Sequence, residues 1–203
     1  MVMVLGSMSA TECTVTEGTV TAGRPTPDSL RLRAARADDA LCLGVLATQV
    51  FLDTYATGGI RPAIAREVLA AFSSDAMAHA IAQDNICIAV AEIDGHLVGF
   101  SQLTLDASHP MAPPGRAAEL FRLYVQEPFT ARGIGRQLLR AAEVSAADRG
   151  ATVLWLTPWV HNTRALRFYA HCGYEDHGPT AFHMEGETHE NRVFARVLHG
   201  PAE

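Results

Sequence analysis

Apolar positions along the chain follow two different spacings, and each spacing predicts one kind of secondary structure. Alternation from Leu30 to Arg33 is typical of a half-buried strand, whereas Leu41 and Val45 repeat at helical spacing. Ser73-Ser74 is an N-cap candidate. Asp94-Gly95 separates two short apolar runs, which predicts a tight hairpin. The elements predicted for this part are a strand at 30–33, helices at 38–55, 62–72 and 75–83, and strands at 86–92 and 96–104.

Strand and helix patterns alternate after residue 118. A strand, a helix of about four turns and a second strand form a parallel crossover, because the helix returns the chain to the same end of the sheet. Both ends of the chain favour antiparallel pairing, so we expect an α/β (α+β) fold with a mixed, mostly antiparallel sheet of six or seven strands flanked by helices. The predicted elements are strands at 118–125, 151–157, 174–184 and 191–198 and helices at 133–149 and 162–172.

The length and composition favour one globular domain. With 203 residues, of which 48% are apolar, the chain can bury a full core. Residues 1–28 are rich in Thr, Gly, Ser and Pro, so we expect a flexible N-terminal tail followed by a single domain over 29–203. The opening segment Met1 to Leu5 is too short for a membrane span and lacks a basic region, so we expect neither export nor a membrane partner.

Charge and cysteine content restrict the partners and the location. A net charge of −6 without a basic cluster argues against nucleic acid and is compatible with a cationic ligand. The four cysteines lie far apart without a Cys-x-x-Cys pair, which indicates reduced thiols and a cytoplasmic location. His171, His177, His183 and His189 recur every six residues but fall on different predicted elements, so no metal is expected.

A glycine turn, Arg132-Gly133-Ile134-Gly135-Arg136, lies between the apolar strand ending at Val125 and a long predicted helix. A turn of this kind presents several backbone N–H groups that lack helical acceptors, with the positive end of the helix dipole behind them. Such an arrangement binds phosphate. Leu138 replaces the third glycine of a dinucleotide fingerprint, and there is no P-loop Lys-Ser pair. Two glycines alone also fit an ordinary tight connection.

Two motifs resemble those of the GCN5-related N-acetyltransferase (GNAT) superfamily. The family pattern Gln/Arg-x-x-Gly-x-Gly/Ala matches residues 130–135, except that Thr130 stands where Gln or Arg is usual. The segment from Asn162 to Tyr169 matches Asn-x-x-Ala-x-x-Phe-Tyr in full. The resemblance spans about residues 30–198 and is specific over 120–174. It implies the GNAT fold, in which the central parallel pair of strands splays apart.

The resemblance also implies that acetyl-CoA is the acetyl donor and that the chain binds it mostly through its backbone. The strand residues Leu123, Tyr124 and Val125 would pair with the pantetheine arm, and their N–H groups would polarise the thioester carbonyl. Asn162 would contact the same arm, although Asn directly before a helix is also a good N-cap. The residues expected to hold the pyrophosphate are Thr130, Ala131, Arg132, Gly133, Ile134, Gly135 and Arg136.

Tyr169 and Glu119 are the candidate catalytic residues. In the family, the tyrosine at the position of Tyr169 protonates the departing thiolate. A phenol with a pKa of about 10 and a thiol with a pKa of about 8.5 are close enough for this proton transfer to be nearly balanced. The helical spacing of Tyr169 with Ala165 and Phe168 equally fits a packed core aromatic. Glu119, at the start of the strand, is the candidate base for the attacking ammonium, and a solvated strand end is its alternative.

The acceptor site is predicted from aromatic and acidic side chains, which suit an ammonium ligand. A narrower resemblance, to the bacterial spermidine/spermine N-acetyltransferase group, lies in Phe51 to Tyr55, in Tyr174 and in Phe182 to Gly186. Most of the candidate acceptor residues fit a core position equally well. They are Phe51, Asp53, Tyr55, Trp155 and Trp159.

The sequence therefore predicts an enzyme that transfers an acetyl group from acetyl-CoA to a primary amine, by direct attack in a ternary complex. A small polyamine-like cation is the favoured acceptor, and a protein α-amine or lysine is the second candidate. A non-catalytic acyl-CoA sensor is an alternative of a different class. The oligomeric state stays open, with a homodimer as one option.

Overall fold

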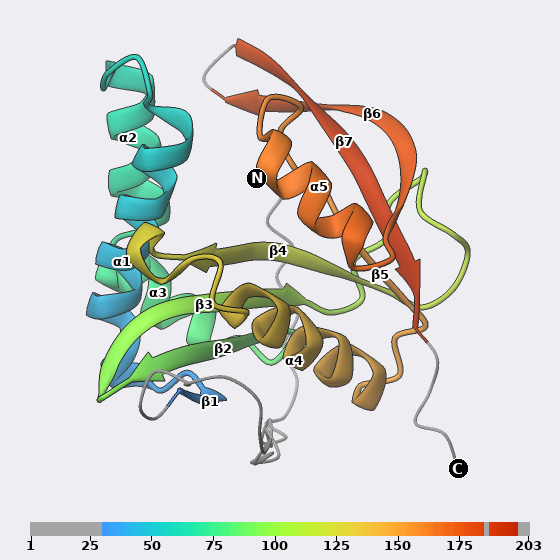
Figure 1. The fold of residues 1–203 in the computed structure, drawn as a ribbon, viewed down its shortest axis with the longest axis horizontal. Helices are drawn as coiled ribbons and strands as arrows, with labels where there is room; N and C mark the ends of the chain where they lie inside the picture. The colour runs from blue at the N-terminus through green and yellow to red at the C-terminus, as the bar shows by residue number, and fades with distance from the viewer. Residues whose placement is uncertain (1–29, 185–186, 199–203) are drawn as a thin grey trace.

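The computed structural model describes residues 30–184 and 187–198, so the tail predicted at 1–28 lies outside the described residues. Seven strands form one open sheet in the order β1-β2-β3-β4-β5-β7-β6 (Figure 1). β4 and β5 are parallel, and the other neighbouring strands are antiparallel, which confirms the predicted mixed sheet. The strands are β1 (Arg31–Ala34), β2 (Ile86–Ile93), β3 (His96–Thr104), β4 (Ala117–Val125), β5 (Val153–Leu156), β6 (Glu175–Met184) and β7 (Glu187–Val197).

The helices also follow the sequence pattern closely. Short 3-10 turns at η1 (Ala37–Asp39) and η2 (Glu127–Phe129) accompany them. The helices are α1 (Ala40–Tyr55), α2 (Pro62–Ala71), α3 (Ser74–Ile81), α4 (Ile134–Asp148) and α5 (Thr163–His171).

Local sequence explains several of these boundaries. The Ser73 hydroxyl accepts a hydrogen bond from the Ala76 N–H at 3.1 Å, as expected of an N-cap, and Pro62 occupies the first turn of α2. Asp94 and Gly95 have φ of 51° and 80°, the left-handed pair that a two-residue hairpin turn requires. β5 ends at Leu156, earlier than predicted, because Pro158 has no N–H for a ladder.

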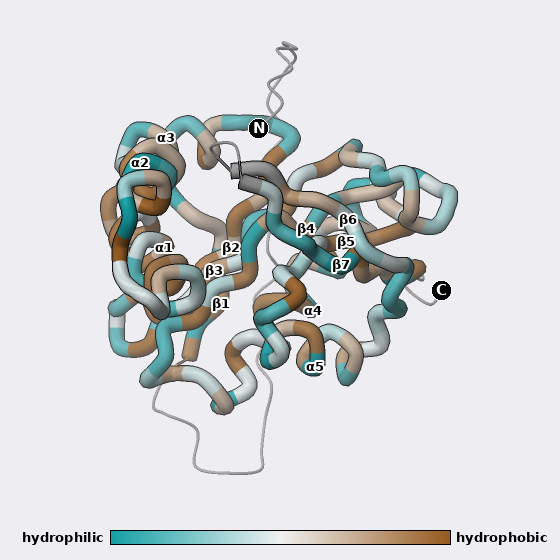
Figure 2. The backbone as a smooth tube through the Cα atoms, turned by 90° about the horizontal axis from the view of Figure 1, so that it is seen from above, coloured by the Kyte–Doolittle hydropathy of each residue, from teal (hydrophilic) through white to brown (hydrophobic). Residues whose placement is uncertain are grey.

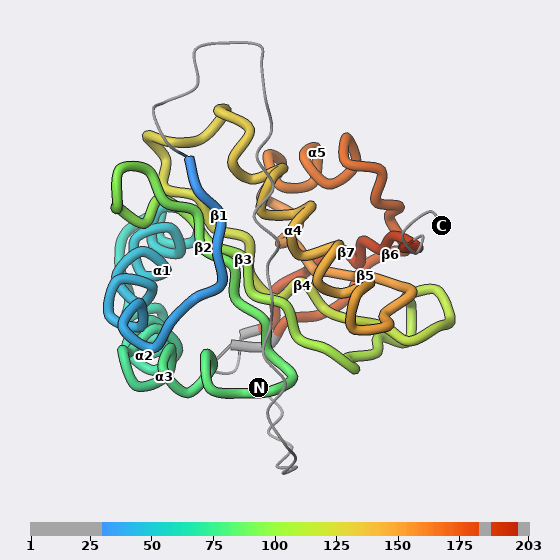
Figure 3. The backbone as a smooth tube through the Cα atoms, turned by 90° about the horizontal axis from the view of Figure 1, so that it is seen from below, coloured from blue at the N-terminus to red at the C-terminus, as the bar shows by residue number. Residues whose placement is uncertain are grey.

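The sheet separates two helical layers, because successive side chains of a strand point to opposite faces. Val90 and Phe100 pack with α1, α2 and α3 in one apolar cluster. Ala91 packs with Ile134 and Leu138 of α4 in another. Figure 3 shows α1 to α3 on one side of β1 to β3 and α4 on the other, and Figure 2 shows the same layers from above with their hydropathy.

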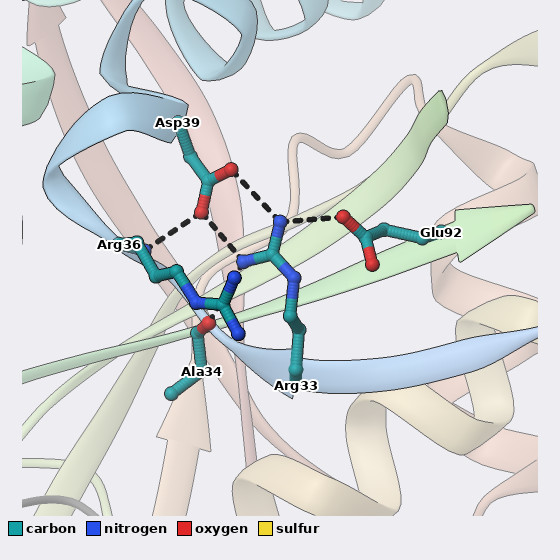
Figure 4. A network of polar contacts seen from close by, with 5 residues as sticks. All are labelled: Arg33, Ala34, Arg36, Asp39 and Glu92. Atoms are coloured by element: carbon teal, nitrogen blue, oxygen red, sulfur yellow. Dashed lines mark hydrogen bonds and ion pairs between the residues drawn. The ribbon is translucent and has the colours of Figure 1, made fainter. Parts of the chain in front are cut away.

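A partly buried ion-pair network fixes the start of α1. Arg33 donates to both carboxylate oxygens of Asp39, at 2.6 and 2.9 Å, and to Glu92 of the neighbouring strand (Figure 4). Asp39 also accepts from the Arg36 backbone N–H at 2.7 Å. The hydrogen bond from Arg33 holds the pKa of Asp39 below its usual value. β1 and the entry to α1 are thereby joined to β2.

Candidate active site

The two parallel strands at the centre of the sheet run together only briefly. Three residue pairs join β4 to β5, the last of them Glu119 with Trp155, whereas β4 continues to Val125. The opposite edge of β4 stays paired with β3 as far as Val125 and Gly99. The part of β4 after Glu119 therefore has an edge that no described strand covers, as expected for a splayed pair.

Backbone alternation decides which groups of β4 point into this opening. The Gln126 N–H donates to the Val98 carbonyl of β3 at 3.0 Å. Because backbone groups alternate in direction along a strand, those of Tyr124 also point to β3, whereas those of Leu123 and Val125 point to the opening. Tyr124 therefore enters the site through its side chain and not through its N–H.

The glycine turn has the backbone conformation of an anion-binding loop. Ala131 and Gly133 are left-handed, with φ of 58° and 82°, and Gly133 caps α4 without a side-chain hydrogen bond. The first bond of the helix runs from the Gln137 N–H to the Gly133 carbonyl. The N–H groups of residues 134–136 therefore have no helical acceptor and lie at the positive end of a 15-residue helix.

Side chains around the turn hold its shape. The Thr130 hydroxyl donates to the Glu127 carbonyl at 2.8 Å, so this hydrogen is used within the turn. The Glu127 carboxylate accepts from Arg164 at the start of α5 at 2.7 Å. Arg132 lies over the Phe129 ring at 5.3 Å, and Arg136 is exposed. The turn is thus connected to α5, which carries the second motif.

A cavity of about 410 Å³ opens at the splay and receives side chains from α1, α2 and α5 and from the β6–β7 hairpin. Eight of the predicted site residues line it: Phe51, Tyr55, Glu119, Leu123, Tyr124, Trp159, Asn162 and Tyr169. Further lining residues include Arg61, Glu67, Phe72, Phe121, Arg122, Phe182 and Asn191.

Tyr169 is both a packed residue and a cavity residue. Its ring lies 5.8 Å from that of Tyr174 and 6.5 Å from that of Phe194, and only 8% of the residue is exposed. Burial raises the pKa of Tyr169 above its usual value, and the nearby phenols of Tyr55 and Tyr124 raise it further. The phenol is therefore protonated at neutral pH.

Glu119 is half-buried in the cavity, and its charge is poorly solvated. Burial raises the pKa of Glu119 to about 7, against the opposing influence of Arg122. In the part of the chain that the structure describes, no hydrogen bond or ion pair of its carboxylate is found. A carboxyl group that titrates near neutrality suits the exchange of a proton with an ammonium group.

Asn162 has the N-cap role that sequence analysis weighed, since its side-chain oxygen accepts from the Ala165 N–H at 3.0 Å. It also lines the cavity.

Two predicted acceptor residues do not line the cavity. Asp53 is exposed, because on α1 it lies between Phe51 and Tyr55 in sequence and thus on the far side of the helix from them. Trp155 shares the face of its β4 partner Glu119, but it packs there with Ala117 and Ala112, and its Nε1 donates to the Ala107 carbonyl at 2.7 Å. Trp155 is therefore a core residue.

Sequence analysis missed Arg122, Glu67 and Phe72 in the cavity. Arg122 is the one charged residue within the apolar run from Leu120 to Val125, and this interruption was a usable signal. Glu67 and Phe72 lie on and just after α2, where nothing in the local pattern distinguishes them from other helix positions.

Residues 30–184 and 187–198 contain no group of three or more His, Cys, Asp or Glu side chains arranged to hold a metal ion. Among the helices of the same residues, none is long and apolar enough to cross a membrane.

Several solved acetyltransferase structures share this architecture. The PaiA N-acetyltransferase of Thermoplasma acidophilum, solved with coenzyme A, has a TM-score of 0.67 at 22% identity and covers 83% of this chain and 99% of its own. YncA of Salmonella typhimurium, solved with acetyl-CoA, has a TM-score of 0.61 at 16% identity, with 87% and 98% covered. At these identities the likeness concerns the fold.

Sequence comparison gives the family. An uncharacterized N-acetyltransferase of Mycobacterium tuberculosis strain H37Rv is 33% identical over 135 residues, which are 64% of this chain and 81% of the relative. A Lactobacillus delbrueckii relative is 27% identical over 128 residues, 63% of this chain and 74% of its own. The model of the acetyltransferase (GNAT) family matches residues 60–174, more than half of the chain. The chain therefore belongs to the GNAT acetyltransferase family and is an acyltransferase.

Proposed function

We propose that this enzyme transfers the acetyl group of acetyl-CoA to a small primary amine, by direct attack in a ternary complex. The observation that carries the proposal is the meeting of three features at one cavity: the uncovered edge of β4, the half-buried Glu119 and the phenol of Tyr169. Family membership supports the acetyl transfer itself.

The residues of the glycine turn suit coenzyme A. The left-handed Ala131 and Gly133 direct successive N–H groups toward one side, and the start of α4 adds its positive dipole, which suits a pyrophosphate. The Leu123 and Val125 backbone groups on the open edge of β4 suit the amides of the pantetheine arm. When bound, acetyl-CoA would supply an activated thioester.

The side chains of the cavity divide the proton transfers between them. Glu119 accepts the proton that the acceptor ammonium must lose before its nitrogen can attack, directly or through water. A Leu123 or Val125 N–H donates to the oxygen that becomes negative during the attack. Tyr169 donates the proton that the departing thiolate requires, and the packing of its ring against Tyr174 and Phe194 keeps the phenol in place.

The lining of the cavity bears on the class of acceptor. The aromatic rings of Phe51, Tyr55 and Trp159 favour an ammonium ligand, as the polyamine-like expectation requires. Asp53 lies outside, however, and Arg61 lies at the rim, so the cavity lacks the acidic excess that suits a polycation. A protein α-amine is a second candidate, because a ribosomal-protein-alanine N-acetyltransferase of Brucella melitensis shares the fold at a TM-score of 0.59.

Thiol release from acetyl-CoA, measured with spermidine, small monoamines and peptides with an unblocked N-terminus, tests the proposal. We expect turnover with small amines and little with peptides. Tight binding of coenzyme A without thiol release from any of these amines would instead favour a sensor and contradict the proposal.

A further inference from the structure

The cavity contains two arginines and two glutamates, so its formal charge is balanced. Arg61 is exposed at its rim, whereas Arg122, Glu67 and Glu119 are half-buried within it. An arginine inside a site for an ammonium group is unfavourable unless something compensates for its charge. In the proposed acetyl transfer, Glu119 accepts a proton from the amine, but Arg122 has no part in the reaction.

A β-bulge places Arg122 beside Glu119. Ala118 and Leu120 of β4 both pack on the α4 side of the sheet. Simple alternation would put Arg122 on that side too, but the β3–β4 register shifts between Gln102 and Leu103, which leaves one extra residue in β4. Arg122 consequently points to the α2 side, as does Glu119.

Arg122 is held by two aromatic rings and an amide, and the charges of Glu67 and Glu119 act on it without forming an ion pair. Its guanidinium carbon lies 5.0 Å from the ring centre of Phe72 and 4.5 Å from that of Phe121, and its Nη1 donates to Gln102 Oε1 at 2.6 Å. Among residues 30–184 and 187–198, no carboxylate lies within ion-pair distance of it. A guanidinium has five N–H donors in a planar fork, and the rings restrict its orientation.

We infer that the acceptor carries a carboxylate on the same small molecule as its primary amine, and that Arg122 binds this carboxylate while Glu119 receives the ammonium proton. The inference rests on the proposed function and narrows its acceptor class from amines in general to amino-acid-like amines.

The reaction stays balanced with this acceptor. Glu119 takes one proton from the ammonium, the amine nitrogen forms a bond to the acetyl carbon and releases a second proton to water, and the carbon–sulfur bond breaks. The thiolate takes a proton from Tyr169, and water returns a proton to the phenolate. The carboxylate does not react, and its contact with Arg122 orients the amine. A planar carboxylate can accept two parallel hydrogen bonds from the guanidinium group. A polyamine has no carboxylate and cannot accept them.

Matched pairs of acceptors test the inference, each pair an amino acid and the amine that lacks its carboxylate. Suitable pairs are phenylalanine with phenethylamine, methionine with 3-(methylthio)propylamine, and lysine with cadaverine. We expect kcat/KM, measured by thiol release, to favour the carboxylated member of at least one pair by about tenfold or more, because a site built for a polar group rejects the analogue without it. In Arg122→Met the ratio of kcat/KM for the amino acid to kcat/KM for its amine should fall to about one.

Arg140→Met is the matched control, because Arg140 is exposed on α4 and does not line the cavity. The ratio of kcat/KM within each pair of acceptors should be the same in Arg140→Met as in the wild type. Calorimetric titration of wild type and Arg122→Lys with the preferred amino acid adds a measurement independent of turnover, and weaker binding to the lysine variant is expected because the fork is lost.

Three results would overturn the inference. Turnover of the amines without any preference for their carboxylated partners would remove it and leave the proposed function standing. Equal losses on both members of a pair in Arg122→Met would make Arg122 a packing residue. Absence of thiol release with every acceptor would overturn the proposed function and the inference together.

Discussion

The glycine turn at residues 130–136 and the cavity at the splay are built in opposite ways. The turn is made of consecutive residues, and its binding groups are backbone N–H groups at the start of α4. The cavity gathers side chains from α1, α2, β4, α5, β6 and β7, which are far apart in the sequence. The donor site therefore depends on local conformation, whereas the acceptor site depends on how distant elements pack. Substitutions in the two regions should therefore have different consequences.

The largest effect is expected for Gly135→Glu in the turn. A Cβ at Gly135 would lie 3.7 Å from the Phe168 ring, so a longer side chain must occupy the space near the turn and bring a negative charge to a phosphate site. Like charges placed together cost several kcal/mol, so the Kd for coenzyme A should rise by about 100-fold or more. Isothermal titration calorimetry measures this.

Gly58→Glu is its matched control, because a Cβ there meets nothing within 4 Å and the residue does not line the cavity. An unchanged Kd for Gly135→Glu would show that the turn does not hold the pyrophosphate.

The next largest effect is expected for Glu119→Gln in the cavity. Because burial raises the pKa of Glu119 to about 7, the carboxylate that accepts the proton is the minority form at pH 6 and the majority form at pH 8. Wild-type kcat/KM should rise through about pH 7, and the variant should lose this rise together with about 100-fold of kcat. The measurement is a pH–rate profile with two acceptors of different amine pKa.

An inflection that moves with the acceptor would exclude Glu119 as its source. Glu67→Gln provides the comparison within the same cavity, and a greater loss there would assign the base to Glu67.

A smaller effect is expected for Tyr169→Phe, which keeps the ring packing but removes the proton donor. We expect kcat to fall by about tenfold, since water can replace part of the function, while the Kd for coenzyme A stays nearly unchanged. Tyr174→Phe is the matched control, because the Tyr174 hydroxyl donates to Glu143 and lies outside the cavity. Equal kcat losses in both variants would refute a specific acid role for Tyr169.

The smallest effects are expected for substitutions of the two tryptophans, Trp159 in the cavity and Trp155 in the core. Trp159→Phe should raise the acceptor KM by about threefold, because Trp159 lines the cavity and contacts the Tyr55 ring at 5.5 Å. Trp155→Phe should lower the free energy of unfolding by about 1 kcal/mol through loss of the bond to Ala107, without changing that KM. Steady-state kinetics measures the acceptor KM, and chemical denaturation measures the free energy of unfolding. A change in KM for Trp155→Phe with an unchanged KM for Trp159→Phe would contradict the assignment of these residues.

Sequence alone determined the elements, their order and the glycine turn, because each depends on residues close together in the chain. Alternating apolar positions located the strands, Ser73 and Asp94-Gly95 marked a helix start and a hairpin, and Gly133 allows one of the two left-handed residues of the turn. These signals are local and act before any long-range packing.

Tertiary structure alone decided which side chains share the cavity. Sequence spacing did not distinguish Trp155 from Trp159 as acceptor residues, but Ala107 and Ala112 pack over Trp155, which does not line the cavity. It gave no role to Arg122, because a bulge that depends on the pairing of β4 with β3 determines the face to which this residue points. The physical reason is that register and splay are properties of paired strands, and no single segment contains them.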